Sequence, residues 1–257
     1  MIREAMLPET EEVSQALRLA AAPLFFGWEE TMIQSALEGC MGQVVTDGKQ
    51  PPKAAQIVLG DFCFFGGTPD AALVKNAKAP IMTPQNDAWS DLIARVWSDS
   101  ATKATRYAIR KEGDVFDRDK LDGYVAALPQ EYTLVPITAE HFDVLQGESW
   151  SADFCGQFRD AADFSARGIG VLALRDGVPV AGASSYAVYR GGIEIEIDTH
   201  PAHRRRGLAT ACGAQLILSC LARNLYPSWD AHDLNSVALA EKLGYHLAHP
   251  YTVYIKK

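Results

Sequence analysis

The sequence has no apolar run approaching the roughly 20 residues that a membrane-spanning helix needs. Residues 1–4 lead into an acidic amphipathic segment, so we expect neither a secretion signal nor membrane association, and we expect a cytoplasmic location. There are five cysteines, an odd number without metal-ligand spacing, which predicts reduced, mostly buried thiols and no metal site. The net charge of −8 argues against binding nucleic acid through a broad basic surface.

What the chain does have is length and ordinary hydrophobicity. With 257 residues, 48% of them hydrophobic, it can form one large or two modest domains. The first half carries no chemical motif, and its periodicity predicts an α/β accessory domain over residues 1–128. The expected helices there are 9–22 with Thr10 as N-cap, 31–38, 85–97 and 118–127, and the expected strands are 55–65 and 102–110.

The second half, residues 129–257, is expected to form another domain in which strands and helices alternate. Asp176-Gly177 predicts a tight hairpin turn between two of the strands. The expected strands are 131–136, 169–175, 178–189, 193–199, a short one at 228–229 and 246–255, and the expected helices are 139–146, 150–167, 207–222 and 235–243.

The segment with the clearest chemistry is the basic loop between the strand at 193–199 and the helix at 207–222. A helix start offers bare amides and the positive end of the helix dipole, which together favour a bound anion. Gly207 and Ala209 allow a ligand to approach the backbone closely. Arg204, Arg205 and Arg206 stand where the dipole disfavours cations unless an anion is present. The loop therefore predicts a diphosphate site; a solvated basic loop is the alternative.

The order Arg204-x-x-Gly207-x-Ala209 resembles the acyl-CoA diphosphate loop of the GNAT superfamily of N-acetyltransferases. Asn235 to Tyr245, with Lys242-Leu243-Gly244-Tyr245 at its end, resembles a second signature of that superfamily. The resemblance spans roughly residues 131–257. The sequences of residues 199–209 and 229–245 are most similar to the group typified by the zwittermicin self-resistance acetyltransferase. It implies an α/β (α+β) GNAT fold with a mixed, central, splayed sheet flanked by helices.

The resemblance also implies how acetyl-CoA is bound as cosubstrate. The amides of Ile197 and Thr199 would hold the pantetheine arm and the thioester oxygen, and the amides from Arg205 to Thr210 would hold the diphosphate. The full set of cofactor-binding residues implied is Ile197, Asp198, Thr199, Arg204, Arg205, Arg206, Gly207, Leu208, Ala209, Thr210, Asn235 and Ser236.

Strand alternation separates two faces just before the loop. Ile193, Ile195 and Ile197 share one face, and Glu194, Glu196 and Asp198 share the other. A carboxylate there could take the amine proton through water or bind a cationic acceptor, and we take Glu196 first and Glu194 second as the catalytic residue. The alternative is a solvated sheet face, and a bulge, frequent in GNAT strands here, would reassign the faces.

The chain departs from the family pattern where many members carry a tyrosine as general acid. Ala240 stands at that position, so the acid is unassigned; Tyr186, Tyr189, Tyr251 and Tyr254 are candidates by residue type alone.

We expect an acetyl-CoA-dependent N-acetyltransferase acting on a small-molecule amine, antibiotic-like or amino-acid-like, in a ternary complex. The alternative is a non-catalytic acyl-CoA-binding sensor or regulatory module. The sequence is compatible with a homodimer.

Overall fold

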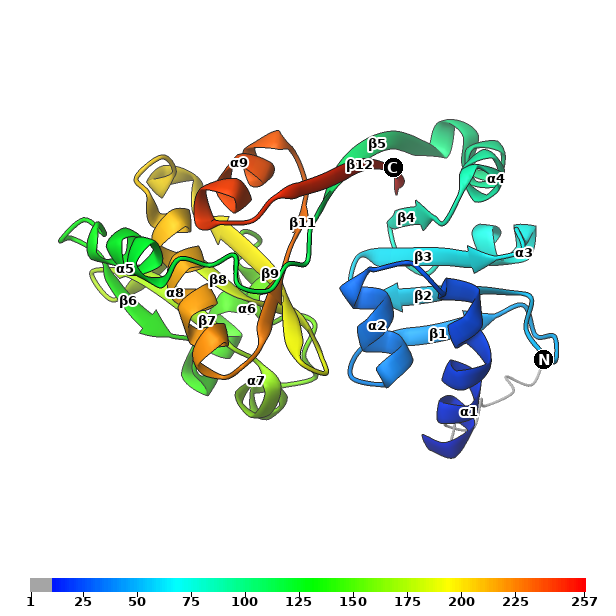
Figure 1. Ribbon diagram of the computed structural model, residues 1–257, viewed down its shortest axis with the longest axis horizontal. Helices are drawn as coiled ribbons and strands as arrows, with labels where there is room; N and C mark the ends of the chain where they lie inside the picture. Colours follow the sequence, from blue (N-terminus) through cyan, green and yellow to red (C-terminus); the bar gives the residue numbers. More distant parts are fainter. Residues whose placement is uncertain (1–10) are drawn as a thin grey trace. The chain divides into compact units, whose positions relative to one another are not determined.

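The computed structural model describes residues 11–257, which form two compact units (Figure 1). The first unit extends to Lys103 and includes Val253–Lys257; the second is Ala104–Thr252. Two strands, β5 (Ala101–Ile109) and β12 (Leu247–Lys256), pass from one unit into the other. Within residues 11–257, none of the helices combines the length and the apolar composition that a membrane span requires.

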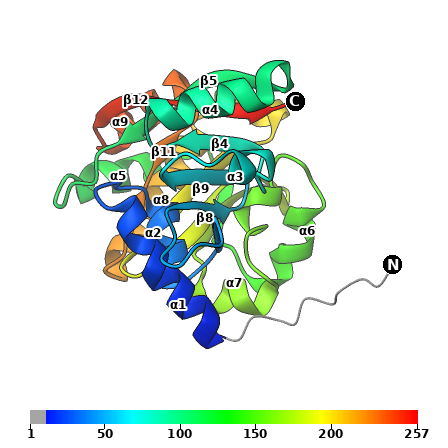
Figure 2. The ribbon, with the colours of Figure 1, turned by 90° about the vertical axis from the view of Figure 1, so that its right-hand side faces the viewer.

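The first unit is a sheet covered by helices. Its strand order is β1 (Gln43–Thr46), β2 (Ala54–Leu59), β3 (Phe62–Gly67), β4 (Ile81–Pro84) and the end of β12, and only β3 and β4 pair in parallel. Its helices are α1 (Glu11–Ala21), α2 (Thr31–Glu38), α3 (Ala71–Lys75) and α4 (Asp87–Trp97), with 3-10 turns at Ala22–Phe25 and Ser98–Ser100. Figures 1 and 2 show α1 and α2 beside β1 and β2.

Alternation along β3 divides the core of this unit between the two sheet faces. Cys63 and Phe65 join a buried cluster with Trp89 of α4, whereas Phe64 packs edge-on against Trp28 beside α2. Burying apolar area at roughly 25 cal/mol per Å² is the main source of stability for such a layer arrangement.

Most of the expected elements of this unit are confirmed, and one is wrong. Residues 31–38 and 85–97 are helical as expected, and α1 agrees with the first expected helix, although Thr10 lies outside the described residues. The single strand expected at 55–65 is a hairpin instead, because Gly60 turns the chain with φ +52° and Leu59 pairs with Phe62. A run that is apolar throughout hides such a turn, since both strands are buried.

The second unit contains a five-stranded mixed sheet in the order β10-β9-β8-β7-β6. The strands are β6 (Thr133–Pro136), β7 (Gly170–Arg175), β8 (Val178–Tyr189), β9 (Gly192–Thr199) and β10 (Tyr226–Ser228), and only β9 and β10 pair in parallel. The helices are α5 (Arg118–Ala126), α6 (Phe142–Gln146), α7 (Ala161–Arg167), α8 (Leu208–Ala222) and α9 (Leu234–Leu243), with 3-10 turns at Ala139–His141, Ala152–Phe154 and Pro201–His203. This confirms the predicted mixed sheet flanked by helices.

Local signals explain most boundaries in the second unit. The predicted hairpin turn is confirmed, with φ +53° at Asp176 and +80° at Gly177. The helix expected over 150–167 is wrong: its first part is irregular, and α7 begins only at Ala161, because the Asp160 side chain caps the amide of Asp163. The helix expected over 139–146 is a 3-10 turn followed by α6.

The sheet splits beside β9, as predicted. β10 pairs with β9 only from Gly192 to Glu194, and the last pair joins Ser228 to Glu194. The chain then enters β11 (Asp230–Ala231), which pairs with β5 and not with β9. Among residues 11–257, the second half of β9 therefore pairs with β8 on one side and with no strand on the other. We call this opening the fork.

The helix α5 belongs to the same unit as the fork. It packs against α8, and its Leu121 is fully buried. The domain boundary that we predict at residues 128 and 129 lies inside this compact unit, after α5. Four of the five cysteines are buried; burial raises the pKa of the Cys212 and Cys220 thiols to about 12, so both stay protonated near neutral pH.

Candidate functional site

The backbone of β9 offers hydrogen-bond donors to the fork. The His200 N–H donates to Val180 O on β8 (2.9 Å), and Gly191 O accepts from Tyr226 N at the start of β10 (2.8 Å). The backbone N–H and C=O groups of successive strand residues point to opposite neighbouring strands. Those of the odd-numbered residues of β9 therefore point toward the β10 side. The amides of Ile197 and Thr199 therefore point to the side from which β10 has departed. Their predicted roles in holding the pantetheine arm and the thioester oxygen stay a prediction.

One carboxylate organises the end of β9. Asp198 Oδ1 accepts from the Thr199 amide (2.6 Å) and lies 3.6 Å from Arg204 Nη2. Arg204 Nε in turn donates to Thr199 O at 3.1 Å. Asp198 and Arg204 thus hold the strand end and the loop together. Of the two fork-facing amides, that of Thr199 is bonded to Asp198, whereas that of Ile197 takes no part in these contacts.

The loop ends in a helix start that no side chain of the described residues caps. Gly207 is the N-cap residue of α8, with φ +82°, and Arg205 also has a positive φ, +62°. A Cβ added at Gly207 would meet no atom within 4 Å, so the space beside it is open. By contrast, α2, α4, α5 and α9 each begin with a side chain that accepts a first-turn amide. The bare amides and dipole at α8 suit an anion.

Behind the loop, Tyr132 joins two of its residues. Arg206 Nη1 donates to the Tyr132 hydroxyl (3.3 Å), which lies 3.1 Å from His203 Nδ1. Desolvation and the nearby Arg206, Arg175 and His200 lower the pKa of His203 below its ordinary value of 6.5. His203 is therefore neutral near pH 7 and acts in packing and loop support.

The two candidate acids lie on the face expected of them. The bulge in this part of the sheet is in β8, between Ser185 and Ala187, so alternation along β9 is intact. Ile197 faces α8, where its Cδ1 would be 3.1 Å from a Cβ at Gly213. Glu194 and Glu196 point to the other face; Glu194 is buried at the last β10 pair, and Glu196 is half-buried beyond it.

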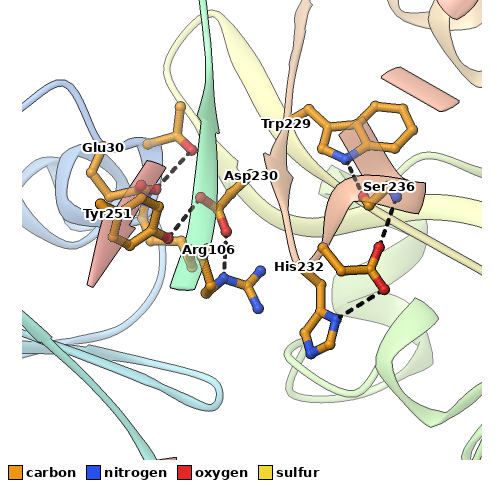
Figure 3. A network of polar contacts seen from close by, with 10 residues as sticks. Glu30, Arg106, Trp229, Asp230, His232, Ser236 and Tyr251 are labelled. Carbon is orange, nitrogen blue, oxygen red and sulfur yellow. Dashed lines mark hydrogen bonds and ion pairs between the residues drawn. The ribbon is translucent and has the colours of Figure 1, made fainter. Parts of the chain in front are cut away.

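The start of α9 is tied to the fork through Trp229. Trp229 Nε1 donates to Ser236 Oγ (3.1 Å), and the Ser236 amide donates to the capping Asp233 (2.9 Å), as Figure 3 shows. The predicted cofactor residues Asn235 and Ser236 therefore lie on the first turn of α9, where Asn235 is exposed and the Ser236 side chain is engaged. At the first turn of α8, Lys242 Nζ donates to Thr210 Oγ1 (3.3 Å).

The tyrosines named by residue type take different places. Ala240 is fully buried at the position where the family pattern has tyrosine. The Tyr189 hydroxyl lies 3.0 Å from Ser228 Oγ at the fork, whereas that of Tyr254 lies 2.8 Å from Ser90 in the first unit. Tyr251 donates to Asp230. Tyr186 is buried at the β8 bulge.

Sequence reasoning missed a buried charge cluster next to the fork. Asp230 accepts from Arg106 Nε (2.6 Å) and from the Tyr251 hydroxyl (2.7 Å), as Figure 3 shows. Burial raises the pKa of Asp230, against the opposing effect of Arg106 and Tyr251. The three residues come from β11, β5 and β12, so no local pattern could bring them together. Within residues 11–257, no group of three or more His, Cys, Asp or Glu side chains could hold a metal ion.

A mixed sheet that forks beside an uncapped, glycine-containing helix start defines a protein of the GNAT class. The chain belongs to the GNAT acetyltransferase family, which it matches over residues 22–254, so the family pattern includes the first unit. Members of this family generally use acetyl-CoA as acetyl donor.

Three known proteins show how far the similarity extends. A GCN5-related N-acetyltransferase-like protein from Streptococcus suis has a solved structure that is 43% identical, with a TM-score of 0.91 over 95% of this chain and 100% of that one. The uncharacterised N-acetyltransferase YdfB of Bacillus subtilis is 25% identical over 185 residues, covering 70% of this chain and 67% of its own. A GCN5-related N-acetyltransferase from Kribbella flavida, 17% identical with a TM-score of 0.52 over 95% of each chain, shares the fold.

Proposed function

We propose that the protein transfers the acetyl group of acetyl-CoA to the amine of a small molecule, by direct attack in a ternary complex. The observation that carries this proposal is the placement of the fork-facing Ile197 amide on the strand that leads to the start of α8, which no side chain among the described residues caps. This arrangement fits an extended thioester carrier that ends in a diphosphate. The open space at Gly207 fits the same group.

The chemistry needs held reactants, a donor to the developing oxyanion and a proton acceptor. The amine nitrogen forms a bond to the acetyl carbon while the carbon–sulfur bond breaks. The Ile197 amide donates to the carbonyl oxygen, and the amides from Arg205 to Thr210, with Arg204 at the family position, hold the diphosphate. The amine proton passes to a carboxylate on β9, directly or through water, and the thiolate takes a proton from solvent.

Glu196 is our first choice for that carboxylate. It lies on the half of β9 that β10 does not pair with, whereas Glu194 is buried at the last β10 pair, with Ser228. We expect Glu196→Gln to lower kcat roughly 100-fold with little change in the KM for acetyl-CoA. Glu194→Gln is the comparison. The pH dependence of kcat would show which substitution removes the acidic limb, and loss of that limb in Glu194→Gln alone would reverse the assignment.

The acceptor is proposed from chemistry and resemblance. The carboxylates of Glu194 and Glu196 and the acidic net charge favour a cationic amine. The similarity of the loop to the zwittermicin self-resistance group suggests an antibiotic-like or amino-acid-like compound. The proposal needs no metal, because amide donors and a carboxylate supply the required groups.

The test is thiol release from acetyl-CoA in the presence of a panel of such amines, together with calorimetry of CoA binding. We expect saturable binding and acceptor-dependent release. Binding without release for every acceptor would instead support the second candidate, a non-catalytic acyl-CoA sensor, which the alanine at position 240 favours. No heat and no rise in Tm with millimolar CoA would reject both.

A further inference from the structure

The backbone just before α8 has an unusual conformation that its own hydrogen bonds do not enforce. Arg205 has φ +62° and Gly207 has φ +82°, so both lie in the left-handed region. A residue other than glycine adopts this conformation at a cost, and it persists where the surrounding contacts enforce it. Among residues 11–257, no backbone–backbone hydrogen bond involves Arg205 or Arg206. The direction of their amides therefore depends on side-chain contacts.

Two arginine side chains supply contacts of this kind. Arg204 is bonded to Asp198 and to the Thr199 carbonyl, which fixes the beginning of the segment at the end of β9. Arg206 lies between the two left-handed residues, and its Nη1 donates to the Tyr132 hydroxyl at 3.3 Å. The end of the segment is thus attached to a residue outside the loop.

Tyr132 is a firm point of attachment. It directly precedes β6, it is 4% exposed, and its amide donates to Pro129 O (2.9 Å). Because the hydroxyl oxygen accepts from Arg206, the hydroxyl proton is available to His203 Nδ1 at 3.1 Å. Desolvation lowers the pKa of His203, so that near pH 7 the neutral imidazole can accept this proton. The hydroxyl is therefore held in the orientation that Arg206 requires.

We propose that Tyr132 is a positioning residue for the loop, whose hydroxyl fixes Arg206 and thereby the direction of the amides from Arg205 to Gly207. This inference rests on the proposed function, in which these amides hold the diphosphate. The Arg206 side chain then supports the loop, and its amide serves the ligand. Donors that are already ordered bind an anion more tightly than donors that must be ordered on binding. Loss of the hydroxyl should therefore weaken binding of the carrier and spare the chemical step.

The experiment compares Tyr132→Phe with a matched control. Tyr226, in the same unit, has a hydroxyl that likewise joins two partners: it accepts from Glu112 N (2.9 Å) and donates to Arg110 O (3.3 Å). Tyr132→Phe should raise the KM for acetyl-CoA and the Kd for CoA about tenfold, with kcat within about twofold of the wild type. Tyr226→Phe should change none of them. No change in Tyr132→Phe, or equal changes in both variants, would overturn the proposal.

A double variant tests whether Tyr132 acts through Arg206. Arg206 is exposed, so Arg206→Met should fold normally. We expect this variant to raise the KM for acetyl-CoA about tenfold. Tyr132→Phe combined with Arg206→Met should raise it no further, because both substitutions remove the same contact. A loss in the double variant equal to the product of the two single losses would show that the residues act independently, which contradicts the proposal.

The order of the loop can also be measured without ligand, which separates this inference from the proposed function. By 15N relaxation, the amide order parameters of residues 205–207 should be roughly 0.85 in the wild type and in Tyr226→Phe. In Tyr132→Phe they should fall below about 0.6. Unchanged order parameters in Tyr132→Phe would overturn the proposal even if the protein binds CoA. Failure of the wild type to bind CoA would reject the proposed function itself.

Discussion

At the scale of single residues, the candidate site depends on backbone conformation more than on side-chain chemistry. Gly207 adopts φ +82° and ends the loop beside open space. A side chain there would project into the region where we place the diphosphate. Gly177, in the β7–β8 hairpin, has nearly the same φ, +80°, and the same open surroundings. The two glycines therefore form a matched pair for testing the location of the site.

We expect Gly207→Glu to abolish CoA binding through steric block and charge repulsion. Gly177→Glu should have a similar backbone strain, about 1 kcal/mol, and leave binding intact. Calorimetry measures the binding, and circular dichroism with a thermal melt checks that both variants fold. Normal CoA affinity in Gly207→Glu would show that the diphosphate lies elsewhere.

His203 gives a prediction about pH. Its pKa is lowered in the folded protein, mainly by desolvation and then by Arg206, Arg175 and His200. The unfolded chain therefore binds a proton more readily, and stability falls as the pH drops below 6.5. We expect His203→Asn to lose less Tm than the wild type between pH 7.5 and 5.5. An equal loss in both proteins would mean that His203 does not contribute to acid destabilisation.

At the scale of elements, the fork is maintained by what holds β11 away from β9. β11 has only two residues, and its Asp230 is tied to Arg106 of β5 and Tyr251 of β12. The Arg106 and Asp230 side chains are 12% and 6% exposed, so the pair is well shielded from water. Removing one partner of a buried pair leaves an uncompensated charge.

We expect Asp230→Ala to destabilise the protein by about 3–5 kcal/mol, measured by urea unfolding. Tyr251→Phe should cost less, about 1–2 kcal/mol, since it removes hydrogen bonds of the hydroxyl to Asp230 and Arg106 but leaves the ion pair. The double variant Asp230→Ala with Arg106→Met should recover part of the loss, because it also removes the buried cation that Asp230 balances. A double variant no more stable than Asp230→Ala alone would contradict the charge argument.

At the scale of the whole molecule, the family match and the second compact unit both begin well before residue 129, where the sequence predicts that the second domain begins. The match covers residues 22–254, and the second unit begins at Ala104, so α5 is part of it. Leu121 of α5 is fully buried, and Tyr124 donates to Lys242 O at the end of α9 (3.2 Å). Removal of α5 would expose the apolar surface that it covers on α8.

We therefore expect a fragment of residues 129–257 to fold poorly. It lacks α5 and also β5, the partner of β11. Its urea midpoint and helix content should fall well below those of the full chain, and it should precipitate on concentration because apolar surface is exposed. A fragment that melts cooperatively and binds CoA like the full chain would show that residues 129–257 are an independent domain.

Local sequence determined much of this protein. The periodicity of residues 31–38, 178–189 and 208–222, the turn at Asp176-Gly177 and the glycine at the start of α8 are specified by short-range sterics and hydrogen bonding. The family resemblance depended on the same contiguous residues. The order of elements leading to the loop could thus be predicted without the fold.

Tertiary structure decided what depends on partners distant in the chain. The length of the β9–β10 pairing, the packing of α5 on α8 and the Asp230 cluster each join segments that no local pattern relates. The same holds for the Thr199 hydroxyl, which is buried without a hydrogen-bond partner among residues 11–257. Burial and pairing depend on which surfaces of the folded chain meet. The sequence could therefore predict the fork, but not the burial and partners of the side chains around it.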